Sequence, residues 1–361
     1  MSAKINSVDS AIKQIISDAI WAPSGENCQP WKFVVDRNNI RLFNLPERDQ
    51  SAYSWGQRAS YMANGACLEN FCISAQHLGY KPEVSLLSNV ADENLVADIN
   101  LSAADIKESS LYKFIKLRST NRKPYGVDPL PPEQVKEIME SVNGYDVDVY
   151  ITQENDKKIT LGRVGALNEE VMLSNEYLHR FFFSHVNWTR EEDERKKVGF
   201  FIDTLELPGP ATLAFRLFRH WKIIRFLNKF GMNKMVGKQN ARTNSLSAGF
   251  GVIVIKGKTP KDFVIAGRAL QRIWLTATKF NLSLQPLTGI LFLMHKISAG
   301  QTMEFTEKQI KTIKAGYRVL CREFNIEGND TVAFMFRLGV GGSPSARSVR
   351  FNVDEVTETV K

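Results

Sequence analysis

The chain has 361 residues, of which 43% are hydrophobic, and it carries a formal net charge of +8 at pH 7. This length can bury the core of two domains, or of one fused unit, without disulfides or metals. The four cysteines form no C-x-x-C pair and the five histidines are scattered, so neither a zinc site nor a disulfide framework is indicated. No uncharged apolar run reaches the roughly 18 residues of a membrane span, and the N-terminus lacks an apolar core of signal-peptide length. We therefore expect a cytoplasmic protein with no integral membrane span.

The first predicted element is a short amphipathic helix that leads into a polar loop. Its apolar face is formed by Ile12, Ile15, Ile16, Ala19 and Ile20. The helix breaks at the Pro and Gly of residues 22–31, APSGENCQPW. This loop can expose backbone N–H groups, the Ser24 hydroxyl and the Asn27 carboxamide to a planar polar ligand, before a strand that begins at Trp31. The alternative is an ordinary helix-to-strand turn with Trp31 in the core.

A basic motif, RSTNR, lies about a hundred residues downstream at residues 118–122. Two guanidiniums, those of Arg118 and Arg122, flank the hydroxyl of Thr120. Arginine suits a phosphate because it presents a planar fork of donors and stays charged. The alternative is a solvated helix cap or a surface ion pair. Further on, residues 141–152 indicate a helix end that leads straight into a strand.

Residues 165–240 contain two unusual segments. A charged patch, REEDERKK, is flanked by aromatic clusters and followed by a Pro-Gly-Pro break. Residues 213–238 then have the pattern of one basic amphipathic helix. Such a helix could lie on an anionic membrane surface or bind acidic partners, but we favour a helix packed on its own domain with a solvated basic face. No recognised nucleic-acid-binding signature accompanies it, so we expect no nucleic-acid partner.

Two stretches, residues 62–80 and 267–290, have a similar layout. In each, a glycine is followed by a predicted helix and then by a turn or loop that contains glycine. The second has one broad apolar face, formed by Ala269, Leu270, Ile273, Trp274, Ala277 and Phe280. Each is also readable as an ordinary buried core helix. We interpret them as equivalent helices of two divergent copies.

The chain ends with a predicted strand, a glycine turn and a basic pair, FRLGVGGSPSARSVRF at residues 336–351. Arg347 and Arg350 form the basic pair and would complete a phosphate site begun by the arginines of residues 118–122. The alternative is a flexible basic turn.

Together these motifs resemble the nitroreductase family of FMN flavoproteins. Members typically begin with Arg-x-Ser-x-Arg/Lys and carry a Pro-Ser-x-x-Asn-x-Gln-Pro-Trp loop after it, whereas here the loop comes first, at residues 22–31, and the arginines come second. Family members are normally intertwined homodimers in which each site combines a phosphate grip from one subunit with the loop of the other. Two fused copies therefore explain the inverted order, and the pattern is similar to the double-length, Acg-like branch of the superfamily. One composite site survives, and its mirror image is expected to be empty.

The resemblance implies an α+β, nitroreductase-like fold, an intrachain pseudo-dimer of two antiparallel-sheet-plus-helices units. The first copy would span residues 1–112 and supply the Pro-Ser-x-x-Asn loop. The second would span residues 113–361, supply the phosphate arginines and the loop near flavin N5, and carry a helical lid insertion at about 165–240. We expect the internal pairing to leave a monomer or a weak homodimer.

The resemblance also implies FMN as the cofactor and assigns the site residues. The phosphate would be held by Arg118, Thr120, Arg122, Arg347 and Arg350. The isoalloxazine and ribityl chain would contact Pro23, Ser24, Asn27 and Gln29. The loop that begins at Pro286 would bring the backbone of Thr288 and Gly289 to flavin N5.

The implied activity is reduction of a small-molecule substrate by an FMN-dependent NAD(P)H oxidoreductase. NADH or NADPH would be the electron donor, and a nitroaromatic, quinone or other conjugated molecule the acceptor. The alternative is an FMN-binding storage or sequestration protein, with a lid-covered flavin and little reductase activity.

Overall fold

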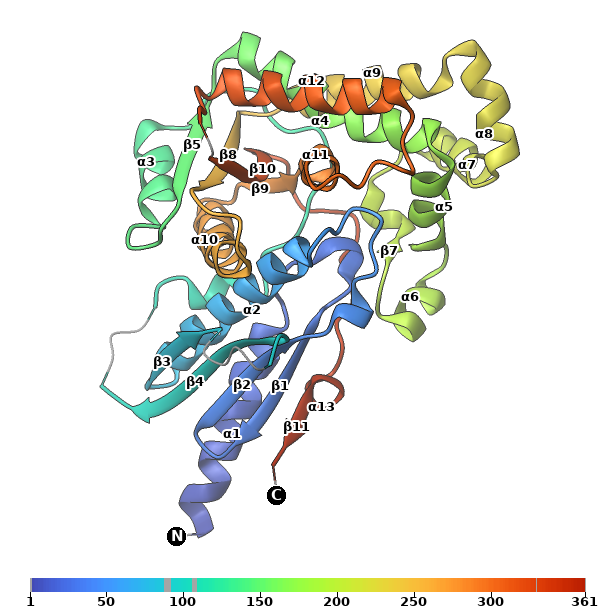
Figure 1. The fold of residues 1–361 in the computed structure, drawn as a ribbon. Coiled ribbons are helices and arrows are strands. Elements are labelled where there is room, and N and C mark those ends of the chain that lie inside the picture. The colour runs from blue at the N-terminus through green and yellow to red at the C-terminus, as the bar shows by residue number, and fades with distance from the viewer. Residues whose placement is uncertain (1, 88–91, 106–108, 329, 361) are drawn as a thin grey trace.

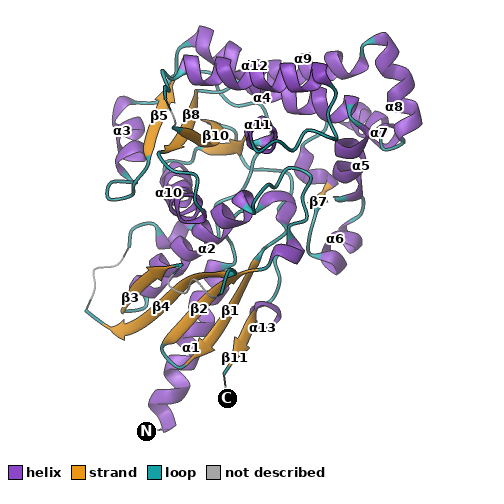
Figure 2. Ribbon diagram, viewed as in Figure 1, coloured by secondary structure: helices purple, strands orange, loops and turns teal. Residues whose placement is uncertain are grey.

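The computed structural model describes residues 2–87, 92–105, 109–328 and 330–360, with side chains from Ser10 onward. Figure 1 shows the two larger sheets with their helices, one near the termini and one at the opposite end of the molecule. Figure 2 shows that helices separate the two sheets and cover the outer side of the second. Among the described residues, no helix combines the length and apolar character needed to cross a membrane.

The first sheet has the strand order β11-β1-β2-β4-β3. Its strands are β1 (Trp31–Asp36), β2 (Asn39–Asn44), β3 (Tyr80–Leu86), β4 (Leu95–Ala103) and β11 (Thr357–Thr359). All neighbours are antiparallel except β1 and β11, which run parallel with Phe33 aligned to Thr357. The helix α2 (Arg58–His77) packs on β2, β3 and β4, and α1 (Ser2–Ala19) packs on α2. In β1 every second side chain is buried, which is the period of a strand with one covered face.

The second sheet has the order β5-β8-β10-β9 and is antiparallel throughout. Its strands are β5 (Asp148–Thr152), β8 (Gly249–Ile255), β9 (Ser283–Pro286) and β10 (Thr331–Gly339). Its helices are α3 (Pro132–Glu140), α10 (Pro260–Lys279), α11 (Gly289–Ser298) and α12 (Glu307–Glu323). In chain order, β5, β8, β9 and β10 are the first to fourth strands of this sheet, and they lie side by side in the order first, second, fourth, third. The strands β1, β2, β3 and β4 lie in the same order in the first sheet. This repeated order confirms the α+β class and the intrachain pseudo-dimer. The division between residues 112 and 113 stays a prediction.

The two helices that we interpreted as equivalents, α2 and α10, pack against each other between the sheets (Figure 1). A Cβ atom at Gly65 would lie 2.1 Å from the carbonyl oxygen of Val264, and one at Gly267 would lie 2.0 Å from that of Met62. Only glycine allows so close an approach of two backbones. Both glycines therefore lie inside the helices at their crossing, and not at the helix starts where the sequence reading placed them.

A buried ion triad also joins α2 to α10. The Glu69 carboxylate is 2% exposed and lies 2.8 Å from Nε of Arg268 and 2.9 Å from Nη1 of Arg272. The hydroxyl of Tyr145 donates a hydrogen bond of 2.7 Å to the same carboxylate. Burial alone would raise the pKa of Glu69, but the two arginines and the Tyr145 hydroxyl hold it below its usual value.

Between β5 and β8 the chain forms a mainly helical segment. Its elements are α4 (Asn155–Ser174), α5 (Glu176–Ser184), β6 (Val186–Asn187), α6 (Arg190–Lys196), β7 (Phe200–Phe201), α7 (Gly209–Phe218), α8 (Trp221–Leu227) and α9 (Met232–Ser245). The predicted single basic helix over 213–238 is therefore divided among α7, α8 and α9. His220 takes an extended backbone conformation between α7 and α8, and Gly231, at φ 83°, takes the left-handed conformation before α9. Because α4 and α9 pack along each other, the proposed limits of the lid insertion fall inside two paired helices.

The remaining short elements are 3₁₀ turns and a C-terminal turn of helix. They are η1 (Gly25–Asn27), η2 (Pro46–Arg48), η3 (Tyr112–Phe114), η4 (Ile202–Leu205), η5 (Asn228–Phe230) and α13 (Val353–Val356). After β10 the chain leaves the second sheet and runs back to β11 in the first, so residues 340–356 connect the two sheets.

Candidate anion and cofactor site

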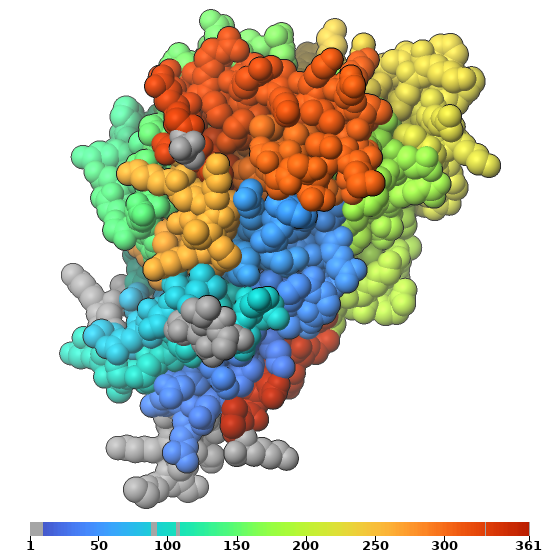
Figure 3. All heavy atoms as spheres, viewed as in Figure 1, coloured from blue at the N-terminus to red at the C-terminus, as the bar shows by residue number. Residues whose placement is uncertain are grey.

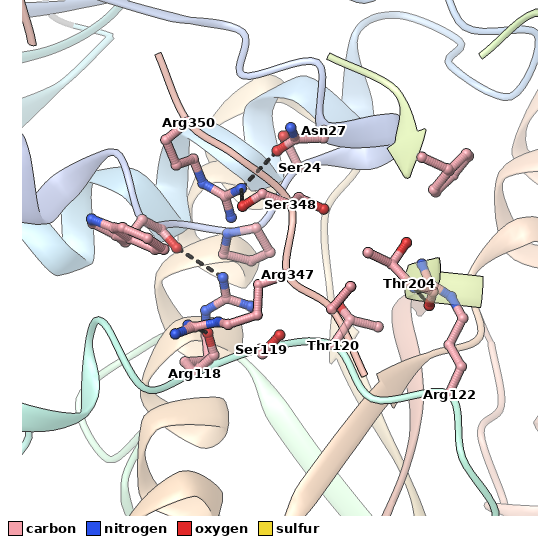
Figure 4. A pocket seen from close by; sticks show the side chains of 14 residues that line it. Ser24, Asn27, Arg118, Ser119, Thr120, Arg122, Thr204, Arg347, Ser348 and Arg350 are labelled. Atoms are coloured by element: carbon pink, nitrogen blue, oxygen red, sulfur yellow. Dashed lines mark hydrogen bonds between the residues drawn. The ribbon is translucent and has the colours of Figure 1, made fainter. Parts of the chain in front are cut away.

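Four chain segments that are far apart in sequence meet at one cavity between the two copies (Figure 4). The cavity is lined by Trp21, Pro23, Ser24, Asn27, Arg118, Ser119, Thr120, Arg122, Phe200, Thr204, Ala346, Arg347, Ser348 and Arg350. Eight of the predicted cofactor-binding residues are among them. They are Pro23, Ser24, Asn27, Arg118, Thr120, Arg122, Arg347 and Arg350.

The first segment is the loop after α1, which is held in shape by its own side chains. The backbone N–H of Gln29 donates to the Ser24 hydroxyl at 3.0 Å. The buried Asn27 carboxamide donates to the carbonyl oxygens of Lys197 and Val349 at 2.9 and 3.0 Å. Its oxygen accepts a hydrogen bond of 2.8 Å from Arg350. Asn27 therefore ties three segments together at the edge of the cavity.

Gln29 does not line the cavity. Its side chain is fully buried, donates to the carbonyl oxygen of Lys197 at 2.7 Å and accepts from the N–H of Phe351 at 3.0 Å. This side chain therefore fixes the C-terminal segment beside the loop. Its predicted contact with a flavin stays a prediction.

The second segment, residues 118–122, is anchored to the second sheet. The backbone of Thr120 forms a β-bridge with Leu284, which is a residue of β9. The buried amide of Asn121 donates to the Ser283 hydroxyl and to the carbonyl oxygens of Gly341 and Gly342, at 2.9 to 3.1 Å. The arginine motif did not mark Asn121 as a candidate site residue, although Asn121 connects this motif to the glycine turn that leads to Arg347.

Arg118 is the most deeply buried of the cavity arginines, at 3% exposure. Its Nη2 donates to the carbonyl oxygen of Trp21 at 2.8 Å, and its guanidinium stacks on the Trp274 ring at 4.5 Å. Its buried Nε has no hydrogen-bond partner. A buried donor of this kind costs free energy unless a ligand accepts from it.

The other arginines are held mainly by backbone carbonyls. Arg350 donates to Ile20 and Ala22 at 3.0 and 3.2 Å. Arg122 donates to the carbonyl oxygen of Thr204 at 2.7 Å, and Arg347 donates to that of Arg118 at 2.8 Å. Figure 4 shows Arg118, Arg347 and Arg350 gathered on one side of the cavity, with Arg122 on the other side beside Thr204.

No carboxylate neutralises these four guanidiniums through an ion pair within the described part of the chain. Burial, followed by the charges of Arg350 and Arg347, holds the pKa of Arg118 well below its usual value. Burial also lowers the pKa values of Arg122 and Arg350 to about 10. Arginine remains charged at neutral pH even so. The cavity therefore concentrates positive charge that no ion pair of the described residues neutralises, and a bound anion would stabilise it.

The predicted N5 loop lies apart from the residues that line this cavity. Pro286 is paired with Phe336, and the N–H of Leu287 donates to Met335 at 2.8 Å. A Cβ at Gly289 would lie 2.2 Å from the Asn168 side chain on α4. Pro286, Thr288 and Gly289 are thus packed between β10 and α4, and their place beside a flavin stays a prediction.

The lining residues that sequence reasoning missed include Phe200 and Thr204. Both come from the segment between α6 and α7, where the N–H of Gly199 also donates to the carbonyl oxygen of Glu26 at 2.7 Å. These residues have no motif spacing of their own, because a tertiary contact brings them to the cavity. Within the described chain, no residue of α7 or α8 lines the cavity.

Glu26, in the loop after α1, makes the stability of the folded protein depend on pH. Burial, with a smaller contribution from Asp49, raises its pKa from 4.5 to about 8. The folded protein therefore binds this proton more tightly than the unfolded chain. Its contribution to stability is complete below pH 4.5 and is lost as the pH rises through about 8.

We expect Glu26→Gln to be more stable than the native protein at pH 9 by roughly 1–3 kcal/mol, and to differ little at pH 5. Urea unfolding at both pH values measures this difference. Glu47→Gln, at an exposed position in the neighbouring turn, is the matched control and should leave the pH profile of stability unchanged. Parallel profiles of the native protein and Glu26→Gln would contradict the assignment.

No family model matches the chain. The protein named "Uncharacterized protein MT1398" of Mycobacterium tuberculosis CDC 1551 is 23% identical over 340 residues, which cover 93% of this chain and 47% of that protein. "Putative NAD(P)H nitroreductase acg" of the same organism is 26% identical over 175 residues, which cover 48% of this chain and 53% of that protein. A solved structure, the NADPH:FMN oxidoreductase of Vibrio harveyi complexed with NAD+, aligns at 12% identity with a TM-score of 0.35, over 67% of this chain and 73% of that one.

The chain spans about half the length of the curated relatives that it matches. The named nitroreductase relative confirms the resemblance to the nitroreductase superfamily and to its double-length, Acg-like branch.

Proposed function

We propose that this protein binds one FMN in the composite cavity and acts as an NAD(P)H-dependent oxidoreductase on a small conjugated substrate. The observation that supports this proposal most directly is the set of four arginines without carboxylate partners, which converge on a cavity that also contains Ser24 and Asn27. The unpartnered Nε of Arg118 fits an anionic ligand group such as a phosphate.

Different residues of the cavity would bind the phosphate and the rest of the cofactor. Arg118, Arg347 and Arg350 would neutralise the phosphate, and Arg122 with Thr120 would donate to it from the other side of the cavity. Pro23, Ser24 and Asn27 would contact the rest of the cofactor, and the backbone of Thr288 and Gly289 would approach N5. When bound, FMN supplies the capacity to accept a hydride and pass electrons to a second substrate. The protein would therefore contribute binding, orientation and exclusion of water more than acid–base groups.

The first test is the flavin content of the purified protein. We expect one FMN per chain, because only one set of arginines and one Pro-Ser-x-x-Asn loop are present. Flavin released by heat and quantified against protein concentration measures the ratio. A ratio near two would mean that the mirror-image site also binds flavin, and a ratio of zero with no uptake of added FMN would contradict the proposal.

A second candidate function is storage or sequestration of FMN with little turnover. It is favoured by the segment of residues 197–206, which lies over the cavity through Phe200, Thr204 and the contact between Gly199 and Glu26. Steady-state oxidation of NADH or NADPH with a nitroaromatic or quinone acceptor separates the two functions. A rate no higher than that of free FMN at the same concentration would favour storage.

The proposal also includes the cellular location, the oligomeric state and the partners of the protein. We propose a cytoplasmic location, since all four cysteines are free thiols and a reducing compartment keeps them so. The internal pairing of two copies would leave a monomer or a weak homodimer. The partner is a small molecule, and the proposal includes no nucleic acid.

A further inference from the structure

The net charge of the chain is concentrated in one segment. Residues 207–261 contain no aspartate or glutamate, and eight basic side chains lie between residues 216 and 242. They are Arg216, Arg219, Lys222, Arg225, Lys229, Lys234, Lys238 and Arg242. The rest of the chain then has as many acidic as basic residues, 39 of each. The charge of +8 is therefore a local property of α7, α8 and α9.

All eight of these basic side chains are exposed, and none forms an ion pair within the described part of the chain. Arg216 and Arg219 lie over the ring of Trp188, at 6.0 and 5.7 Å from its centre, which leaves their charge toward solvent. Figure 3 shows the yellow part of the chain, which contains α8 and the start of α9, at one corner of the molecule.

Large apolar side chains are exposed between these charges. Their exposed fractions are 68% for Leu213, 53% for Leu217, 38% for Ile223, 57% for Phe226, 78% for Phe230 and 61% for Met235. Phe226 and Phe230 lie together, with ring centres 5.5 Å apart. We call the exposed side chains of residues 213–235 the basic–apolar corner. A solvated basic face, the reading that we favoured from the sequence, does not account for these side chains, because leaving them in water costs free energy.

The helical spacing places both kinds of side chain on the same outward face. On α8 and the following turn, Lys222, Ile223, Arg225, Phe226, Lys229 and Phe230 are exposed. The inward side of α8 is marked by Ile224, which is fully buried. Positions three and four apart in a helix share a face. Cations and aromatic rings therefore point outward together, so this side of the molecule offers both positive charge and apolar area to one partner surface.

We propose that the basic–apolar corner binds the surface of an anionic lipid membrane. The cations would contact the lipid headgroups, and Phe226, Phe230 and their apolar neighbours would enter the boundary between headgroups and acyl chains. A nucleic acid or an acidic peptide would satisfy the cations alone and would leave the apolar side chains without a matching layer. The corner is separate from the cofactor cavity, so this proposal does not depend on the proposed function.

Vesicle co-sedimentation of the full chain tests the proposal. We expect binding to vesicles of phosphatidylcholine with 30% phosphatidylglycerol, and no binding to phosphatidylcholine alone. The triple variant Lys222→Gln, Arg225→Gln, Lys229→Gln should bind about a hundredfold more weakly, since each basic side chain near an anionic surface contributes roughly fivefold. Lys308→Gln, Lys314→Gln, Arg318→Gln removes the same charge from exposed positions on α12 and should bind like the native protein.

The double variant Phe226→Ser, Phe230→Ser separates insertion from simple charge attraction. It keeps every cation, and we expect it to bind anionic vesicles at least tenfold more weakly, because two large apolar groups no longer leave water. Circular dichroism confirms that each variant is folded. Absence of native binding to anionic vesicles, or equal loss in the α8 and α12 triple variants, would overturn the proposal. Charge-dependent binding to a polyglutamate peptide without vesicle binding would instead assign the corner to an acidic macromolecule.

Discussion

Replacing Arg118 by methionine is expected to weaken FMN binding by between about 30-fold and a few thousandfold, while the protein without cofactor remains folded. The range follows from the roughly 2–5 kcal/mol that is lost when one partner of a buried, hydrogen-bonded charge pair is removed. Arg118 is nearly fully buried, and its Nε has no partner in the protein. Quenching of flavin fluorescence on titration with the cofactor-free protein measures the affinity.

The stability of the cofactor-free variant is the informative second measurement. The Arg118→Met variant lacks the hydrogen bond to Trp21 and the stacking on Trp274, and this loss destabilises the folded protein. The variant also no longer buries a positive charge beside Arg347 and Arg350, and this change stabilises the folded protein. These effects oppose each other, so we expect a change within about 1 kcal/mol.

Arg337 provides a matched control, because it is also fully buried but each of its three side-chain nitrogens donates a hydrogen bond. It donates to the Gln285 side chain at 2.7 Å and to the carbonyl oxygen of Lys123 at 2.7 Å. Arg337→Met should therefore destabilise the free protein by several kcal/mol, on the scale of a broken buried network. Similar losses of stability in the two variants, or an unchanged FMN affinity in Arg118→Met, would reassign Arg118 to a structural role.

Inorganic phosphate tests the same arginines without a flavin. We expect phosphate to raise the melting temperature of the native cofactor-free protein, because a ligand that binds only the folded state stabilises it. The increase should be smaller in Arg118→Met.

The sequence predicted the parts of this site that lie in continuous segments. The loop of residues 22–31 and the arginines of residues 118–122 are local patterns, and their chemistry could be read without a fold. The two similar helix stretches also predicted a repeated unit, which the strand orders of the two sheets confirm. The reason is that repetition and motif spacing are properties of the linear chain.

The parts that were missed depend on tertiary contacts or on single backbone conformations. Phe200 and Thr204 reach the cavity only because the segment after α6 folds over it. The basic stretch satisfies a helical period throughout, but the left-handed Gly231 interrupts it. In the sequence, the glycines of α2 and α10 look like residues that mark the start of a helix. Only the structure shows that the two helix backbones cross at these glycines and leave no room for a side chain.

Removal of the Glu69 carboxylate is the second change for which we expect a large effect. Glu69→Ala should lower the free energy of unfolding by about 3–5 kcal/mol, because it leaves Arg268 and Arg272 partly buried without their common counter-ion. The triad joins α2 to α10, so the loss falls on the contact between the two copies. Urea unfolding at pH 7 measures the change.

Glu137→Ala, on α3, is the matched control because Glu137 also pairs with α10. The Glu137 carboxylate lies 2.5 Å from Nζ of Lys279, but the two side chains are 47% and 34% exposed. An exposed pair of this kind contributes at most about 1 kcal/mol. Equal costs for Glu69→Ala and Glu137→Ala would mean that burial of the triad does not matter for the pairing of the copies.

The difference in free energy of unfolding between the native protein and Glu69→Ala should depend on pH, and this dependence identifies its electrostatic origin. The folded protein holds the pKa of Glu69 below its usual value of 4.5, so the carboxylate contributes stability above pH 4.5 and loses it as the pH falls through the folded pKa. The gap between the native protein and Glu69→Ala should therefore narrow in acid. A gap that stays constant from pH 7 down to the acid unfolding transition would indicate lost packing instead of a lost charge. In that case the crossing of Gly65 and Gly267 would be the feature that holds the copies together.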